Sequence, residues 1–140
     1  MIHFNYEDTD WRLDLETETT QWIDLITQHH GFQIFEINYV FCSDDYLLYL
    51  NQKYLSHDDY TDILTFDYTT EGTKQLVIDL FISIDRVREN AHNLHVPFID
   101  ELHRVMIHGV LHTMGYNDET ETERQTMRHQ EDYALSLRMF

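Results

Sequence analysis

Residues 105–118 read VMIHGVLHTMGYND, and this stretch predicts a buried helix that ends in a tight turn. Apolar residues surround its histidines on nearly every side, which is typical of a helix in a protein core. His108 and His112 are four residues apart, so a helix carries both imidazoles on one face. We expect Gly115 to end the helix with a positive φ angle. The carboxylate of Asp118 can then reach back to the two imidazoles.

Three such side chains are a typical ligand set for zinc. A buried imidazole without a partner costs free energy, and a metal ion is one partner that removes this cost. Two histidines and one carboxylate bind catalytic zinc and leave the fourth position to water. The metal lowers the pKa of that water toward about 7 and acts as a Lewis acid on a phosphoryl or carbonyl oxygen. We therefore predict one Zn²⁺ ion held by His108, His112 and Asp118.

An interpretation without metal fits the same residues. The chain has ten histidines, so a pair at this spacing also arises by chance. In this alternative the two imidazoles are hydrogen-bonded core residues, and Asp118 or Glu119 favours the N-terminus of the last helix. A peptidase is disfavoured, because Gly109 stands where the HExxH zinc proteases carry the glutamate that serves as general base.

Outward from this segment, the chain predicts alternating strands and helices. Alternation and apolar runs predict strands at Ile2–Tyr6, Gln33–Phe41, Ile63–Tyr68 and Gln75–Ser83. Helical spacing and caps predict helices at Thr19–His30, after the N-cap Ser43, from Ser83 to about Leu94, at Phe98–Met114 and from about Glu121 to the C-terminus. The order β-α-β-α-β-β-α-α-α predicts an α+β fold, a small mixed sheet of about four strands packed against about five helices. The zinc site lies on a central helix of this fold.

Composition and charge limit the classes of protein to consider. The 140 residues suit a single hydrolase domain, residues 1–140. The lone cysteine, Cys42, cannot form an internal disulfide, and neither a signal peptide nor a membrane-spanning segment is visible, so we expect a cytoplasmic protein without membrane contact. Aspartate and glutamate total 26 against 9 lysines and arginines, a net charge of −17. Such a chain repels nucleic acid at long range, so any contact with RNA needs a local basic patch, stacking or the metal.

Three segments resemble the YbeY endoribonuclease family. HGVLHTMGYND resembles the family signature HGxLHxxGYxH. LNQKYLSHDDYTDILTF, residues 50–66, is similar to the family segment LNxxYRxxDxPTDVLSF. DLFISIDRVRENA, residues 79–91, looks like the family segment GDIxIS…A. The three matches occur in order over about half of the chain.

The resemblance implies an α+β fold with the metal at one end of a cleft. It implies a zinc-dependent endoribonuclease, specific for single strands, that acts in maturation of the 16S rRNA 3′ end and in ribosome quality control. The implied partners are ribosomal RNA and the small ribosomal subunit, and the negative charge favours docking through a basic ribosomal protein. An alternative function is a zinc-stabilised ribosome-associated binding factor with little nuclease activity, and a metallopeptidase is less favoured.

The resemblance carries over the zinc ligands only in part. His108 and His112 match the family histidines directly, whereas Asp118 stands where the family pattern has a third histidine. Aspartate binds zinc at about 2.0–2.2 Å, so binding need not be lost. The anionic ligand makes the site less positive and the ion a weaker electrophile, and harder metals such as manganese compete better.

The residues that contact RNA and move protons are not identified by the resemblance. The arginine of the family's YR pair falls at Leu55, and the glycine before Asp79 is Ile78. Candidate replacements for phosphate contact are Lys53, Arg86, Arg88 and Arg104, each of which also fits ordinary surface charge. The general base is unassigned: His57, Asp58 and Asp62 fall in or beside a predicted loop, where a turn or cap role explains them equally well.

Overall fold

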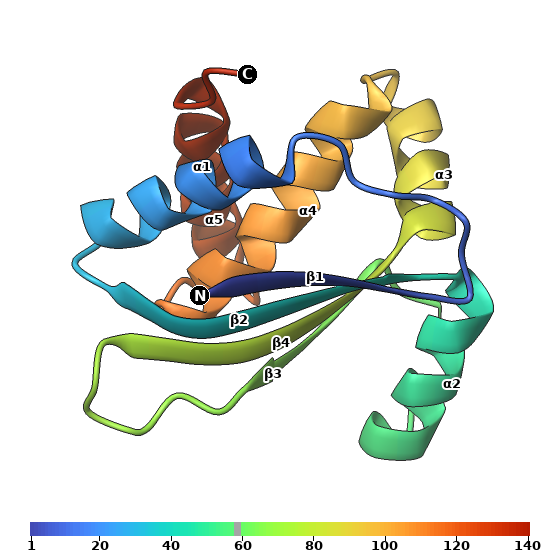
Figure 1. Ribbon diagram of the computed structural model, residues 1–140, viewed down its shortest axis with the longest axis horizontal. Helices are drawn as coiled ribbons and strands as arrows, with labels where there is room; N and C mark the ends of the chain where they lie inside the picture. Colours follow the sequence, from blue (N-terminus) through green and yellow to red (C-terminus); the bar gives the residue numbers. More distant parts are fainter. Residues whose placement is uncertain (58–59) are drawn as a thin grey trace.

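The structure is a computed structural model that describes residues 1–57 and 60–140. The elements follow one another as β1 (Ile2–Glu7), α1 (Glu16–His29), β2 (Gln33–Cys42), α2 (Asp44–Leu55), β3 (Ile63–Asp67), β4 (Gln75–Ser83), α3 (Ile84–Leu94), α4 (Phe98–Thr113) and α5 (Glu121–Ser136). This order is the predicted one, and the α+β class is confirmed (Figure 1).

The four strands form one mixed sheet in the order β1-β2-β4-β3. β1 pairs with β2, and β2 with β4, in parallel, whereas β3 runs antiparallel to β4. Helices α1, α3, α4 and α5 cover one face of the sheet, and α2 lies on the other (Figure 1). The crossover helices explain the parallel pairs, because parallel neighbours need a long connection between them.

The main core lies between the sheet and α4. Alternate residues of β4, Leu76 to Ile82, are buried on the helical side of the sheet. α4 buries most of its length against them and against α1 and α5. Tyr39 of β2 donates its hydroxyl proton to the carbonyl of Met106 over 3.0 Å, which ties α4 to the middle of the sheet. α4 is therefore the central helix of the fold.

Gly109 is the point at which α4 comes closest to the sheet. A Cβ atom built at this position would lie 2.2 Å from Cδ2 of Leu80, 2.9 Å from Cδ1 of Ile63 and 3.2 Å from Oγ1 of Thr65. Such distances leave no room for a Cβ atom unless the side chains of Leu80 and Ile63, or the sheet itself, shift. The residue after His108 is thus a glycine because the packing of helix on sheet leaves no room there.

The end of α4 turns the chain back on itself. The N–H of Gly115 donates to the carbonyl of His112, and the N–H of Tyr116 donates to that of Leu111, each over 3.2 Å. These are the two hydrogen bonds of a Schellman motif, and Gly115 has the positive φ of 109° that this motif requires and that we predicted. The reversed chain then leads to Asp118.

The predicted boundaries differ from the observed ones only at element ends. α1 begins at Glu16, three residues before the predicted Thr19, because Glu16 and Glu18 favour the positive end of the helix dipole. α5 ends at Ser136 instead of running to the C-terminus. Within the described residues, no helix is long and apolar enough to cross a bilayer.

Candidate metal centre

The three predicted ligands come together at the C-terminal end of α4. His108 and His112 lie on one face of the helix, with ring centroids 6.0 Å apart and planes at 79°. Nε2 of His108 is 3.4 Å from Oδ2 of Asp118, and Nε2 of His112 is 3.8 Å from Oδ1 of the same carboxylate. Both imidazoles therefore turn their Nε2 atoms toward Asp118, as metal ligation requires.

These distances can be compared with those of a zinc site. Two ligand atoms about 2.0–2.1 Å from a tetrahedral zinc ion lie about 3.3 Å apart. The His108–Asp118 distance fits this value, whereas His112 must approach further. Accordingly, no group of three His, Cys, Asp or Glu side chains in residues 1–57 and 60–140 is already arranged to hold a metal ion. The chemistry of the three donors fits zinc, and His112, whose side chain is 44% exposed, is the ligand that would have to move.

The capping role considered for Asp118 is filled by another residue. Thr120 is the N-cap of α5, and its hydroxyl accepts the N–H of Glu123 while the Glu123 carboxylate accepts the N–H of Thr120. This reciprocal capping box satisfies the end of the helix without Asp118. The Asp118 carboxylate is consequently available to the two imidazoles.

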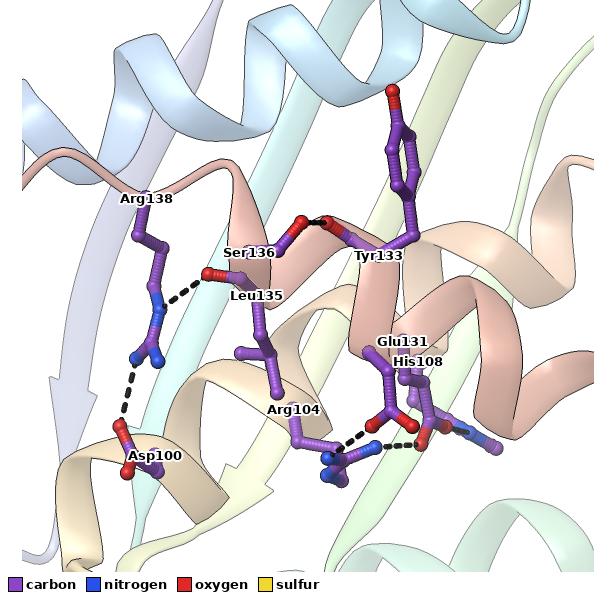
Figure 2. Close-up of polar contacts among 9 residues, drawn as sticks. Asp100, Arg104, His108, Glu131, Tyr133, Leu135, Ser136 and Arg138 are labelled. Atoms are coloured by element: carbon purple, nitrogen blue, oxygen red, sulfur yellow. Dashed lines mark hydrogen bonds and ion pairs between the residues drawn. The ribbon is translucent and has the colours of Figure 1, made fainter.

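A buried glutamate that sequence reasoning missed holds His108 in place. Glu131 on α5 is 5% exposed, and its Oε2 lies 2.7 Å from Nδ1 of His108. Nη1 of Arg104 donates to the other oxygen of Glu131 over 2.9 Å (Figure 2). The sequence does contain a signal for this residue: a carboxylate at helical spacing between two buried apolar residues of α5, Met127 and Ala134.

The contact with Glu131 determines which nitrogen of His108 is free. Nδ1 lies 2.7 Å from the Glu131 carboxylate, whereas Nε2 lies 3.4 Å from that of Asp118, so we assign the proton to Nδ1, which leaves the Nε2 lone pair available for a metal ion. The hydrogen bond to Glu131 also raises the pKa of His108, while burial opposes this change. Metal-binding histidines generally have such a carboxylate or carbonyl partner on the second nitrogen.

A cleft of about 320 Å³ opens beside His108. We call it the metal-site cleft; it lies between the start of β3, α4 and α5, and its ionisable lining is Asp62, Glu101, Arg104, His108, Asp118, Arg128 and Glu131. Burial is the main cause that raises the pKa of Asp62 and that of Glu101. These two carboxyl groups therefore bind protons more readily than ordinary surface acids.

Three of the four cations predicted to contact phosphate lie elsewhere. Arg86 is paired with Asp44 and Glu89, the Arg88 guanidinium lies over the Phe98 ring, and the Lys53 ammonium lies over the rings of Tyr49 and Tyr54. Arg104 does line the cleft, but Glu131 and Asp132 engage its two terminal nitrogens at 2.9 and 2.6 Å. None of the four therefore offers an unengaged charge to the cleft.

The residues considered as general base lie in different places. Asp62 lines the metal-site cleft, whereas His57 is exposed beyond the end of α2. Asp58 lies outside the described residues.

Ile78, which replaces the family glycine, is fully buried in the core and pairs with Ile37 across β2 and β4. Ile78 is part of the apolar core and does not line the metal-site cleft.

The fold and the site together define an α+β protein with a candidate metal centre at a carboxyl-rich cleft. The family model described as endoribonuclease YbeY matches residues 2–137. The endoribonuclease YbeY of Cytophaga hutchinsonii is 48% identical over 139 residues, which cover 99% of this chain and 96% of that protein. The endoribonuclease YbeY of Flavobacterium psychrophilum is 47% identical over 137 residues, 98% of this chain and 96% of that protein. The chain belongs to the endoribonuclease YbeY family.

A solved structure supports the fold independently. A Thermotoga maritima protein, determined in solution, superimposes with a TM-score of 0.68 over 95% of this chain and 87% of its own. Its sequence is 24% identical, so the likeness concerns the fold.

Proposed function

We propose that this protein is a metal-dependent endoribonuclease that hydrolyses phosphodiester bonds in single-stranded RNA. The observation that carries the proposal is the convergence of His108, His112 and Asp118 at the metal-site cleft, in a chain that a family of endoribonucleases matches over residues 2–137. The three donors are of the kind that bind catalytic zinc.

Five side chains at or beside the cleft then have separate roles. A zinc ion held by His108, His112 and Asp118 would supply a Lewis acid for the scissile phosphate and acidify a water molecule. Glu131 orients the His108 ring and keeps its proton on Nδ1. Asp62, whose pKa is raised by burial, is a carboxyl group at the cleft that could exchange a proton during the reaction.

We further propose that the protein acts in the cytoplasm on the small ribosomal subunit, in maturation of the 16S rRNA 3′ end and in ribosome quality control. The net charge of −17 supports docking through a basic ribosomal protein, because opposite charges steer such an encounter. The same charge opposes tight binding of naked RNA, so docking would raise the local concentration of the RNA strand at the cleft.

Two other functions make different predictions. A peptidase of the HExxH type needs a glutamate after the first histidine, and the packing of Gly109 against Leu80 leaves no room for it. A ribosome-associated binding factor would use the zinc ion for stability and would show no metal-dependent cleavage. Activity on RNA therefore decides between the proposal and the second alternative.

The experiment compares the zinc-loaded wild type with His112→Ala on a labelled single-stranded RNA and on the same strand in a duplex. His92→Ala is the matched control, since His92 is exposed on α3. We expect the wild type and His92→Ala to cleave the single strand and His112→Ala to lose nearly all cleavage. Equal background cleavage in all three, with each variant folded, would support the binding factor and overturn the nuclease proposal.

A further inference from the structure

Arg128 differs from every other cation of the chain in its surroundings. The protein has nine lysines and arginines. In the described part of the chain, eight of them contact a carboxylate, a hydrogen-bond acceptor or an aromatic ring: Arg12, Lys53, Lys74, Arg86, Arg88, Arg104, Arg124 and Arg138. Arg128 is exposed on α5, lines the metal-site cleft with His108 and Asp118, and has no such contact there.

The nearest opposing charge does not neutralise Arg128. The guanidinium lies close enough to Glu101 to lower the pKa of that carboxyl group, but the two do not form an ion pair. Burial is the larger influence on Glu101 and raises its pKa overall. Glu101 is 7% exposed and lies in the wall of the cleft. Among the described residues the charge of Arg128 is therefore unpaired, and it lies at the cleft.

An RNA strand requires such a charge at this place. Carboxyl groups of Asp62, Glu101, Asp118 and Glu131 line the cleft, and in a chain of net charge −17 they repel a polyanion. Arginine matches a phosphate well, because its planar fork donates two parallel hydrogen bonds to two oxygens.

We infer that Arg128 binds a phosphate of the RNA strand next to the metal centre and so sets where the strand lies in the cleft. This inference rests on the proposed function, and it assigns to this chain a phosphate-binding residue that is supplied by α5. Arg128 acts on binding, so its loss should raise the KM for RNA more than it lowers kcat.

The test uses the full-length, zinc-loaded protein and a fluorescent single-stranded RNA with 2′-O-methyl groups, and it measures Kd by anisotropy over a range of salt concentrations. Arg128→Gln removes the charge. Arg124→Gln is the matched control, because Arg124 lies one turn earlier on the same helix, pairs with Glu121 and changes the net charge equally. Arg128→Lys keeps the charge without the fork. Cleavage of the unmodified strand is measured in parallel.

We expect Arg128→Gln to weaken binding about tenfold, as for loss of one charge-assisted contact, and to reduce the slope of log Kd against log salt by about 0.7, as for one phosphate on a single strand. Arg124→Gln should stay within about twofold of the wild type, and Arg128→Lys should fall between the two. If the wild type binds and cleaves RNA but both glutamine variants behave alike, this inference is wrong and the proposed function stands. A wild type that neither binds nor cleaves RNA overturns both.

Discussion

The Nδ1–H of His108 donates to Oε2 of Glu131 over 2.7 Å, and this contact joins α4 to α5 across 23 residues of sequence. Arg104 holds the other oxygen of the same carboxylate, so Glu131 is fixed from both sides (Figure 2). The imidazole that presents its Nε2 to the metal centre is therefore oriented by the packing of two helices. Partners of this kind tune metal affinity without touching the ion.

Glu131→Gln should weaken zinc binding by about 10- to 100-fold, because the amide no longer fixes the Nδ1 proton with a charge. Zinc affinity is measured by competition with a chromogenic chelator, and thermal unfolding confirms that the variant is folded. Asp132→Asn is the control: Asp132 also pairs with Arg104, at 2.6 Å, but is 57% exposed. An equal loss in both variants would mean that Arg104, and not the His108 contact, governs the affinity.

Asp118→His should change the metal preference of the site. A third imidazole removes the negative charge of the carboxylate, which favours zinc over harder ions such as manganese. We expect the ratio of zinc to manganese affinity to rise roughly tenfold, equivalent to about 1.4 kcal/mol. Titration calorimetry with each metal measures the ratio, and Asp118→Ala, which should lose affinity for both metals, is the comparison. An unchanged ratio in Asp118→His would show that Asp118 is not a ligand.

Gly109→Ala should destabilise the protein, although alanine favours helices over glycine by about 1 kcal/mol. The added Cβ would lie 2.2 Å from Cδ2 of Leu80, so the buried Leu80 side chain, α4 or the sheet must move. We expect a net loss of about 1–3 kcal/mol in the free energy of unfolding, measured with urea. A Gly109→Ala variant as stable as the wild type would contradict the close packing.

His103 should make the protein less stable in acid. Burial, assisted by the charge of Arg138 and opposed by Asp100, lowers the pKa of His103 to about 4. The unfolded chain, with a pKa near 6.5, then binds a proton that the folded protein rejects, so stability falls as the pH drops from about 6.5 toward 4. Between pH 7 and pH 5 this residue should cost about 2 kcal/mol.

The comparison for this effect is His103→Gln, whose side chain does not titrate and can still accept the hydrogen bond that Arg138 donates to Nδ1 over 2.9 Å. Urea unfolding at both pH values gives the free energies. The loss between pH 7 and pH 5 should be about 2 kcal/mol smaller in His103→Gln than in the wild type. Equal losses would mean that other groups cause the acid sensitivity.

The order and type of the helices and strands could be predicted from local sequence patterns. The alternation in Gln33–Cys42 and the helical spacing in Phe98–Thr113 each report which face of an element is buried, because burial repeats with the period of the backbone. The N-cap at Ser43 could be predicted because its contact is local. As predicted, the Ser43 hydroxyl accepts the N–H of Tyr46, only three residues further along the chain. Interactions within one or two turns can be predicted from the chain alone.

The residues of the candidate metal centre could also be predicted from the sequence. His108, His112 and Asp118 lie within one helix end and its turn, so spacing and the Gly115 signal were enough to group them. The phosphate-contact candidates could not be judged in this way. Arg86 and Arg104 were chosen from their sequence positions, and only their distant partners, Asp44 and Glu131, showed that their charges are already engaged.

By itself, then, the sequence determined the elements, the α+β class and the three side chains of the candidate metal centre, His108, His112 and Asp118. The tertiary structure decided what surrounds them: that Glu131 holds His108, that position 109 admits no side chain, and that Arg128 faces the cleft. The physical reason is that periodicity specifies a buried face but not its neighbour. Which side chain meets His108 depends on how α5 packs against α4, and that packing is set by the core as a whole.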